Sequence, residues 1–98
     1  MEKIIRDGKV AVAVSYGFGA GWSTWNDVDP TDARFNQLFL DGKIAEAESL
    51  CKELELGYEG GADAVSIEWV PVGTKFVIDE YDGAESLMTV DDFSWRIA

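Results

Sequence analysis

The chain has 98 residues, of which 47% are hydrophobic, and carries a formal net charge of −11 from 19 acidic and 8 basic residues. Four Trp, five Phe and three Tyr supply more apolar area than a disordered chain contains, so we expect one ordered domain over residues 1–98. The acidity argues against direct binding to nucleic acid or to an anionic membrane, because such binding needs Lys and Arg to replace counterions.

Residues 9–16 predict the first strand, because larger and smaller side chains alternate there with a period of two. The valines and Tyr16 lie on one face of this strand, and Ala11, Ala13 and Ser15 lie on the other. Both faces are apolar or small. We therefore expect an inner strand whose alanine face lies close beneath a helix.

Residues 16–26 form an uncharged stretch with three glycines and four aromatic residues. Glycine lets another backbone or a ligand approach closely, and Trp and Tyr present large rigid faces, so the stretch suits either a recognition loop or a segment that fills the core. If the stretch is a recognition loop, its aromatic surface contacts a partner or ligand, and if it fills the core, Trp22 and Trp25 fasten the loop to the sheet. The candidate ligand-binding residues are Tyr16, Phe18, Gly19, Gly21, Trp22, Trp25 and Asn26.

Two short helices are predicted to follow and to form a hairpin. Asp29 provides an N-cap and Pro30 a first helical residue for a helix that carries an apolar stripe from Phe35 to Phe39. A second helical pattern begins at Lys43 and continues until Gly57, which is a suitable C-cap.

The remainder of the chain predicts strands. Residues 64–70 and 74–81 alternate on either side of a turn and predict a hairpin, Asp82-Gly83 predicts a second turn, and residues 86–90 and 93–97 predict two further strands. The expected fold is a single α+β domain. It has a mainly antiparallel sheet of four to five strands, with the helical hairpin inserted after the first strand, in the order β-α-α-β-β-β-β.

The residue types present argue against most catalytic and metal chemistry. The chain has no His, and its single Cys51 lies on the apolar side of a predicted helix, which leaves no nucleophile paired with a His base and no typical zinc ligand set. We expect no enzymatic activity, no cofactor and no metal. A hydrolase that uses paired carboxylates is the alternative that remains open.

The acidic charge is concentrated in the second half of the chain, where residues 52–98 contain eleven acids and three bases. The acids of its last third form either a solvated face, a docking surface for a basic protein or a hard-cation site. The candidate partner-binding residues are Asp79, Glu80, Asp82, Glu85, Asp91 and Asp92.

Location is predicted from what the sequence does not contain. The first residues include no uninterrupted apolar stretch of signal-peptide length, and no segment approaches the ~20 apolar residues of a membrane helix. Because a lone Cys51 also forms no intramolecular disulfide, we expect a cytoplasmic protein.

Several segments together resemble a family of short uncharacterised proteins carried by bacteriophages and prophages. They are residues 8–12, 17–26 (GFGAGWSTWN), 68–71, 73–76 and 80–86 (EYDGAES). The resemblance implies a small accessory protein that acts in the host cytoplasm by binding and blocking a host machine, including CRISPR effectors and other defence systems. It implies no catalytic residue.

Three hypotheses follow. The first is a non-enzymatic inhibitor whose acidic surface binds a basic or nucleic-acid-binding host protein. The second is a non-catalytic binder, or sponge, for a nucleotide-like signal, with the aromatic residues of the glycine-rich loop stacked on the base. The third is a homo-oligomer whose loop is buried in a neighbouring copy.

Overall fold

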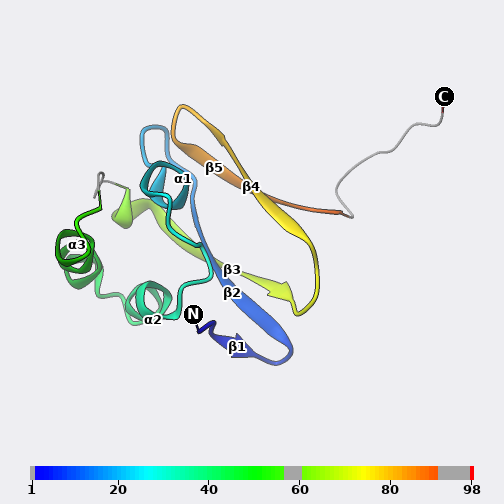
Figure 1. Cartoon of the computed structure of the whole chain (residues 1–98), viewed down its shortest axis with the longest axis horizontal. Coiled ribbons are helices and arrows are strands. Elements are labelled where there is room, and N and C mark those ends of the chain that lie inside the picture. Colours follow the sequence, from blue (N-terminus) through cyan, green and yellow to red (C-terminus); the bar gives the residue numbers. More distant parts are fainter. Residues whose placement is uncertain (1, 57–60, 91–97) are drawn as a thin grey trace.

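The computed structural model describes residues 2–56, 61–90 and 98, and this part of the chain contains three α-helices and five strands in two antiparallel sheets (Figure 1). In chain order the elements are β1 (Ile5–Arg6), β2 (Lys9–Ser15), α1 (Trp22–Asn26), α2 (Ala33–Leu40), α3 (Ile44–Glu53), the 3₁₀ helix η1 (Ala62–Ala64), β3 (Val65–Pro71), β4 (Phe76–Tyr81) and β5 (Ala84–Thr89). The α+β class and the predicted order, with a helical hairpin between an early strand and the later strands, are confirmed. The predicted strand at 93–97 and the C-cap at Gly57 lie outside the described residues.

The first sheet has the order β1-β2-β3, and β2 is its central strand. β3 pairs with β2 along its whole length, from Lys9 opposite Pro71 to Ser15 opposite Val65. The hairpin predicted from residues 64–70 and 74–81 is therefore wrong, because β4 pairs with β5 in a separate sheet. Pro71, which we expected outside the strands, is the last residue of β3.

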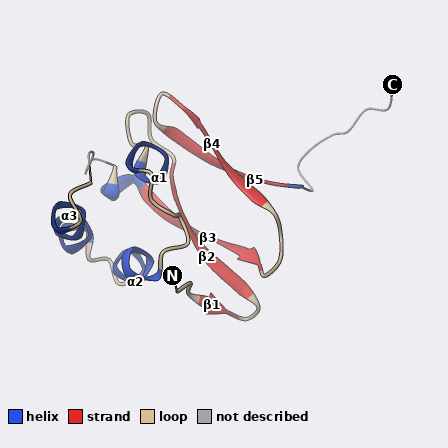
Figure 2. Ribbon diagram, viewed as in Figure 1, coloured by secondary structure: helices blue, strands red, loops and turns tan. Residues whose placement is uncertain are grey.

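Figure 2 shows the helices on one side of the first sheet and the β4–β5 hairpin on the other. This layering follows from the two apolar faces of β2. On the alanine face, Ala13 belongs to a core with side chains of all three helices, including Trp22 and Phe35. On the valine face, Val12 and Val14 pack against side chains of the β4–β5 hairpin. Because the β4–β5 hairpin buries the apolar valine face of β2, the chain leaves the first sheet after β3. This explains why β3 and β4 do not pair. The prediction that the alanine face lies beneath a helix is confirmed.

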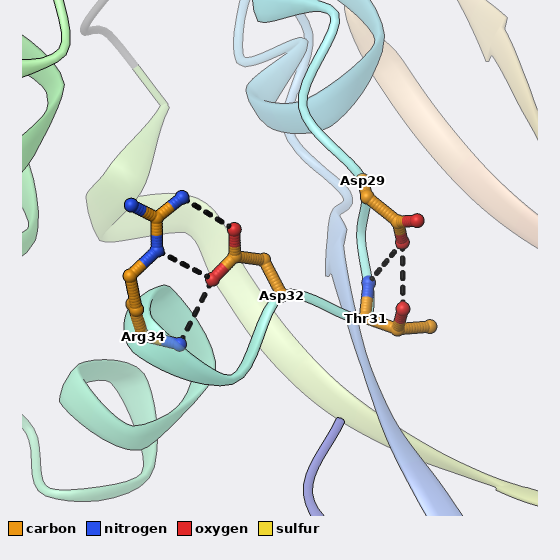
Figure 3. Close-up of polar contacts among 4 residues, drawn as sticks. All are labelled: Asp29, Thr31, Asp32 and Arg34. Carbon is orange, nitrogen blue, oxygen red and sulfur yellow. Dashed lines mark hydrogen bonds and ion pairs between the residues drawn. The ribbon is translucent and has the colours of Figure 1, made fainter. Parts of the chain in front are cut away.

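The start of α2 is three residues later than predicted (Figure 3). Asp32 is its N-cap and accepts a hydrogen bond from Arg34 N at 2.9 Å, whereas Asp29 accepts from Thr31 N at 2.8 Å in the preceding turn. Pro30 lies outside the helix, and its carbonyl accepts from Ala13 N at 2.9 Å. This bond ties the segment before α2 to β2, which fixes where α2 begins.

Two hairpin turns have the same sequence, Asp-Gly, and the same backbone form. Asp7 and Gly8 join β1 to β2 with φ of 52° and 74°, and Asp82 and Gly83 join β4 to β5 with φ of 49° and 83°. Positive φ at both central residues is the requirement of a type I′ turn, for which Asp-Gly is well suited. The turn predicted at Asp82-Gly83 is confirmed. The Asp7-Gly8 turn explains why the chain also forms β1, a strand that we did not expect.

Candidate functional site

The glycine-rich loop and the β4–β5 turn meet at one end of the molecule, although they are far apart in the sequence (Figure 1). Gly19 N donates to Asp82 O at 2.6 Å, and Gly21 N donates to Gly83 O at 2.6 Å. The fold thus brings the predicted aromatic segment and the predicted acidic segment to one place. Some residues of each candidate set therefore share one surface.

Gly21 and Gly83 allow this contact because a side chain at either position would collide with Trp25. A Cβ on Gly83 would lie 2.8 Å from Gly19 N and 2.8 Å from Trp25 Cη2, and a Cβ on Gly21 would lie 2.3 Å from Trp25 Cδ2. These two glycines therefore admit another part of the same chain. They do not leave room for a ligand.

Trp22 and Asn26, two of the candidate ligand-binding residues, are buried. Trp22 is 0% exposed, and its ring makes edge contacts with Phe35 and Phe39 at centroid distances of 5.1 and 5.2 Å. Asn26 Nδ2 donates to the carbonyl of Trp22 at 2.8 Å. The prediction that these two residues bind a ligand is wrong, because both belong to the interior of the helical layer.

The other aromatic residues of this region are exposed. Phe18 is 78% exposed and Tyr81 is 72% exposed, and their rings meet edge to face with centroids 6.4 Å apart. Trp25 is partly exposed, and its Nε1 donates to Glu80 Oε1. Tyr16 donates its hydroxyl to Glu68 Oε1 at 2.7 Å, and burial together with this carboxylate raises the pKa of Tyr16 to about 12.

Acidic residues precede and follow Tyr81 in the sequence. Asp79 and Asp82 are exposed, and Glu80 is half-buried beside Trp25. The sequence has no Lys or Arg from residue 10 to 33 or from 76 to 95, so both segments that build this end carry negative charge alone. Asp91 and Asp92, the last two acidic candidates, lie outside the described residues. We call the exposed surface formed by Phe18, Trp25, Asp79, Glu80, Tyr81 and Asp82 the tip.

Glu85, expected among the exposed acids, is 2% exposed, so its assignment to a partner-binding surface is wrong. Its carboxylate accepts six hydrogen bonds from three backbone amides and three hydroxyls. Oε1 accepts from Ser15 N at 3.0 Å and Ser15 Oγ at 2.9 Å, and Oε2 accepts from Ser23 N at 3.1 Å, Ser23 Oγ at 3.2 Å, Thr24 N at 2.8 Å and Thr24 Oγ1 at 2.8 Å.

These contacts make Glu85 the cap of α1. The residue before this helix, Gly21, has no side chain with which to cap it, and Ser23 and Thr24 are its second and third residues. A helix begins with amides that have no partner within the helix, and here the carboxylate of Glu85 in β5 accepts hydrogen bonds from two of them. Burial alone would raise the pKa of Glu85, but the hydrogen bonds from Ser15 and Thr24 outweigh it and the pKa is lowered. The buried carboxylate is therefore ionised at neutral pH.

Residues 2–56, 61–90 and 98 contain no cluster of three or more His, Cys, Asp or Glu suited to a metal ion. Cys51 is buried on α3, as its place on the apolar side of the helix predicted. Within the same residues, no helix has the length and apolar character needed to cross a membrane.

Comparison with known proteins gives no relative of this chain. No protein-family model matches it, and no curated protein and no solved structure matches it either.

The two Asp-Gly turns provide a matched test of the close contact beneath the tip. Gly8→Ala and Gly83→Ala both place a side chain at positive φ, which costs about 1–2 kcal/mol of folding free energy. Only Gly83→Ala also drives a Cβ into backbone, because nothing lies within 4 Å of the Cβ position at Gly8. We expect urea denaturation to show a clearly larger loss for Gly83→Ala. Equal losses would contradict the contact.

Replacement of Glu85 tests the buried carboxylate. Glu85→Gln places an amide NH₂ where Ser23 and Thr24 donate, so we expect the free energy of unfolding to fall by about 1–3 kcal/mol. Asp79→Asn, on the exposed face of the same hairpin, is the control and should change stability by no more than about 0.5 kcal/mol.

The pH dependence of stability gives an independent readout. The folded-state pKa of Glu85 lies below its ordinary value of 4.5, so the unfolded chain binds the proton more tightly. The stabilisation is complete above about pH 4.5 and is lost as the pH falls through the lower, folded-state value. Wild type should therefore lose more stability than Glu85→Gln over this acidic range. Parallel pH profiles of the two proteins would contradict the assignment.

Proposed function

We propose that this chain is a non-catalytic binding protein whose tip docks on a basic surface of another protein. The observation that carries the proposal is the exposed pair of Phe18 and Tyr81, held beside acids by the hydrogen bonds of Gly19 and Gly21 to the β4–β5 turn. Large exposed aromatic side chains on a rigid support are the typical anchors of protein interfaces.

The acids near the Phe18–Tyr81 pair would orient the partner and increase its rate of association. Asp82 directly follows Tyr81 and Asp79 precedes it by two residues; both acids are exposed, and neither segment of the tip contains a basic residue. Charge of one sign at the rim of an interface accelerates encounter with a surface of the opposite sign and disfavours partners of the same sign. The expected partner is therefore a basic protein, such as one that binds nucleic acid.

A non-catalytic role is supported by the surroundings of two reactive side chains, Glu85 and Cys51. The carboxylate of Glu85 is enclosed by hydrogen-bond donors, and the thiol of Cys51 is buried in the core. The hydrolase alternative would require a pair of acids across a cleft. The exposed acids of the tip, Asp79 and Asp82, lie along one hairpin, in β4 and in the turn that follows it, and such a placement favours binding over catalysis.

The sequence resemblance to phage and prophage proteins extends the proposal to a biological setting. In that setting the partner is a host factor in the cytoplasm, such as a CRISPR effector or another component of anti-phage defence, and binding of the tip inhibits it. The binding of a nucleotide-like signal has less support, because Trp22 is buried and the amides of Gly19 and Gly21 donate to carbonyls of the β4–β5 turn.

Capture from bacterial lysate tests the proposal. Immobilised wild type should retain a basic protein at about 0.1 M salt and release most of it at about 1 M salt, where screening is strong. The double variant Phe18→Ala with Tyr81→Ala should retain at least tenfold less. Leu54→Ala removes an exposed apolar side chain beyond α3 and should behave as wild type.

Two results would contradict the proposal. One is capture of no protein by wild type at either salt concentration. The other is capture that the tip variant and the Leu54→Ala control support equally.

A further inference from the structure

A basic cleft lies at the opposite end of the first sheet from the tip. Arg6, Asp7, Lys9 and Trp69 line a cavity of about 390 Å³, and the Arg6 guanidinium carbon lies 5.7 Å from the centroid of the Trp69 ring. A cation at this distance from an indole face is attracted by the ring. We call these four residues the basic cleft.

The strand register explains how the cleft forms. Arg6 is paired with Lys9 across the β1–β2 hairpin, and Trp69 is paired with Ala11 across β2 and β3. Directly paired residues lie on the same face of a sheet, as do residues two apart in one strand. Arg6, Lys9 and Trp69 therefore project from the same face, near the Asp7-Gly8 turn.

Apart from the contact of Arg6 with the Trp69 ring, the cations of the cleft have no ion-pair or side-chain hydrogen-bond partner in the described part of the chain. Among residues 2–56 and 61–90, Arg34 forms an ion pair with Asp32, whereas neither Arg6 nor Lys9 takes part in an ion pair or a side-chain hydrogen bond. Asp7 lowers the formal charge of the cleft from two to one. A single positive charge next to an aromatic ring remains, in a chain whose net charge is −11.

The tip of a molecule cannot occupy its own cleft. The cleft lies at the Lys9 end of β2, and the loop that carries Phe18 follows the Ser15 end. Seven residues of strand separate these ends by about 20 Å, and Figure 1 shows the two turns at opposite ends of the molecule. A tip and a cleft can meet only between molecules.

We propose that the basic cleft of one copy receives the tip of a second copy, so that the protein associates head to tail. The two surfaces are complementary in charge and in type of side chain. The cleft offers Arg6, Lys9 and Trp69, and the tip offers Asp82 next to the Phe18–Tyr81 pair.

Arg6 is suited to this contact by its position on Trp69. A guanidinium that lies over an aromatic ring keeps its N–H edges available, and these edges bind a carboxylate with two parallel hydrogen bonds. The charge of the cleft matches one carboxylate, for which Asp82 is placed at the apex of the β4–β5 turn. Tyr81 would then pack against Trp69, where edge contacts between rings add to the apolar burial.

Net charge limits the conditions under which association occurs. Two copies that each carry −11 repel one another, but charges beyond the contact are largely screened at about 0.15 M salt, where the Debye length is about 8 Å. Higher salt also weakens the contact itself. We therefore expect association to be strongest at intermediate salt.

A head-to-tail contact leaves one unused tip and one unused cleft at the ends of every assembly, so it does not stop at a dimer unless the geometry closes a ring. Because the inference shares the tip with the proposed function, self-association and partner binding would exclude one another at that surface. It rests on the proposed function to this extent. The cleft has no part in partner capture, which makes the two separable.

Sedimentation velocity of the full chain over a wide concentration range at about 0.15 M salt tests the inference. Wild type should form species larger than a dimer as the concentration rises. Two variants should each remain monomeric: a cleft variant with Arg6→Glu and Lys9→Glu, and a tip variant with Phe18→Ala, Tyr81→Ala and Asp82→Asn. Asn tolerates the positive φ of Asp82, so the turn is preserved.

An equimolar mixture of the two variants gives the sharpest result. Each retains one intact surface, so the mixture should form dimers and no larger species. A control with Lys43→Glu and Lys52→Glu, exposed residues at the ends of α3, makes the same change in net charge and should associate like wild type if the fold and the cleft are intact. Circular dichroism of every variant verifies folding.

The inference is overturned if wild type stays monomeric throughout, or if wild type associates and the mixture does not. Lysate capture separates its failure from that of the proposed function. If the cleft variant still captures a basic protein through the tip while wild type does not self-associate, this inference alone fails.

Discussion

The carboxylate of Glu85 is the interaction on which the position of the tip depends. It belongs to β5, and its six donors belong to the end of β2 and the first turn of α1. A buried charge without a cation is tolerated only when hydrogen bonds replace its hydration, and here each oxygen accepts several. One side chain therefore joins the central strand, the helical layer and the β4–β5 hairpin.

The surface features are consequences of that internal contact. Because β5 is held against α1, the β4–β5 turn lies where the amides of Gly19 and Gly21 reach its carbonyls, and Phe18 meets Tyr81. Aromatic side chains fixed in this way lose little freedom when they bind, which is the usual advantage of a preorganised interface. The same central strand extends to the basic cleft, so a rigid sheet connects two surfaces of opposite character.

The sequence predicted correctly the features that depend on residues close together in the chain. The two faces of β2, the helical hairpin and the Asp82-Gly83 turn all follow from spacing and turn chemistry. We predicted Glu85 among the exposed acids because a run of acids suggests a solvated face. Glu85 is two residues before Leu87 in the same strand, however, and therefore shares the inward face of Leu87, which was a signal that Glu85 is buried. Its donors Ser15 and Ser23 lie in a distant part of the sequence, and no local pattern connects them to it. The pairing of β3 with β2, in place of β4, likewise depends on how the two sheets pack together, which no local pattern shows.

Amide hydrogen exchange in wild type and Glu85→Gln tests most directly whether this carboxylate holds the tip in place. We expect the amides of Ser23 and Thr24, which donate to Glu85, and those of Gly19 and Gly21, which do not, all to lose protection in the variant. The amide of Ala11, which donates to Ile4 O at the other end of β2, should keep its protection. Unchanged protection at Gly19 and Gly21 would show that the tip is held in place without Glu85.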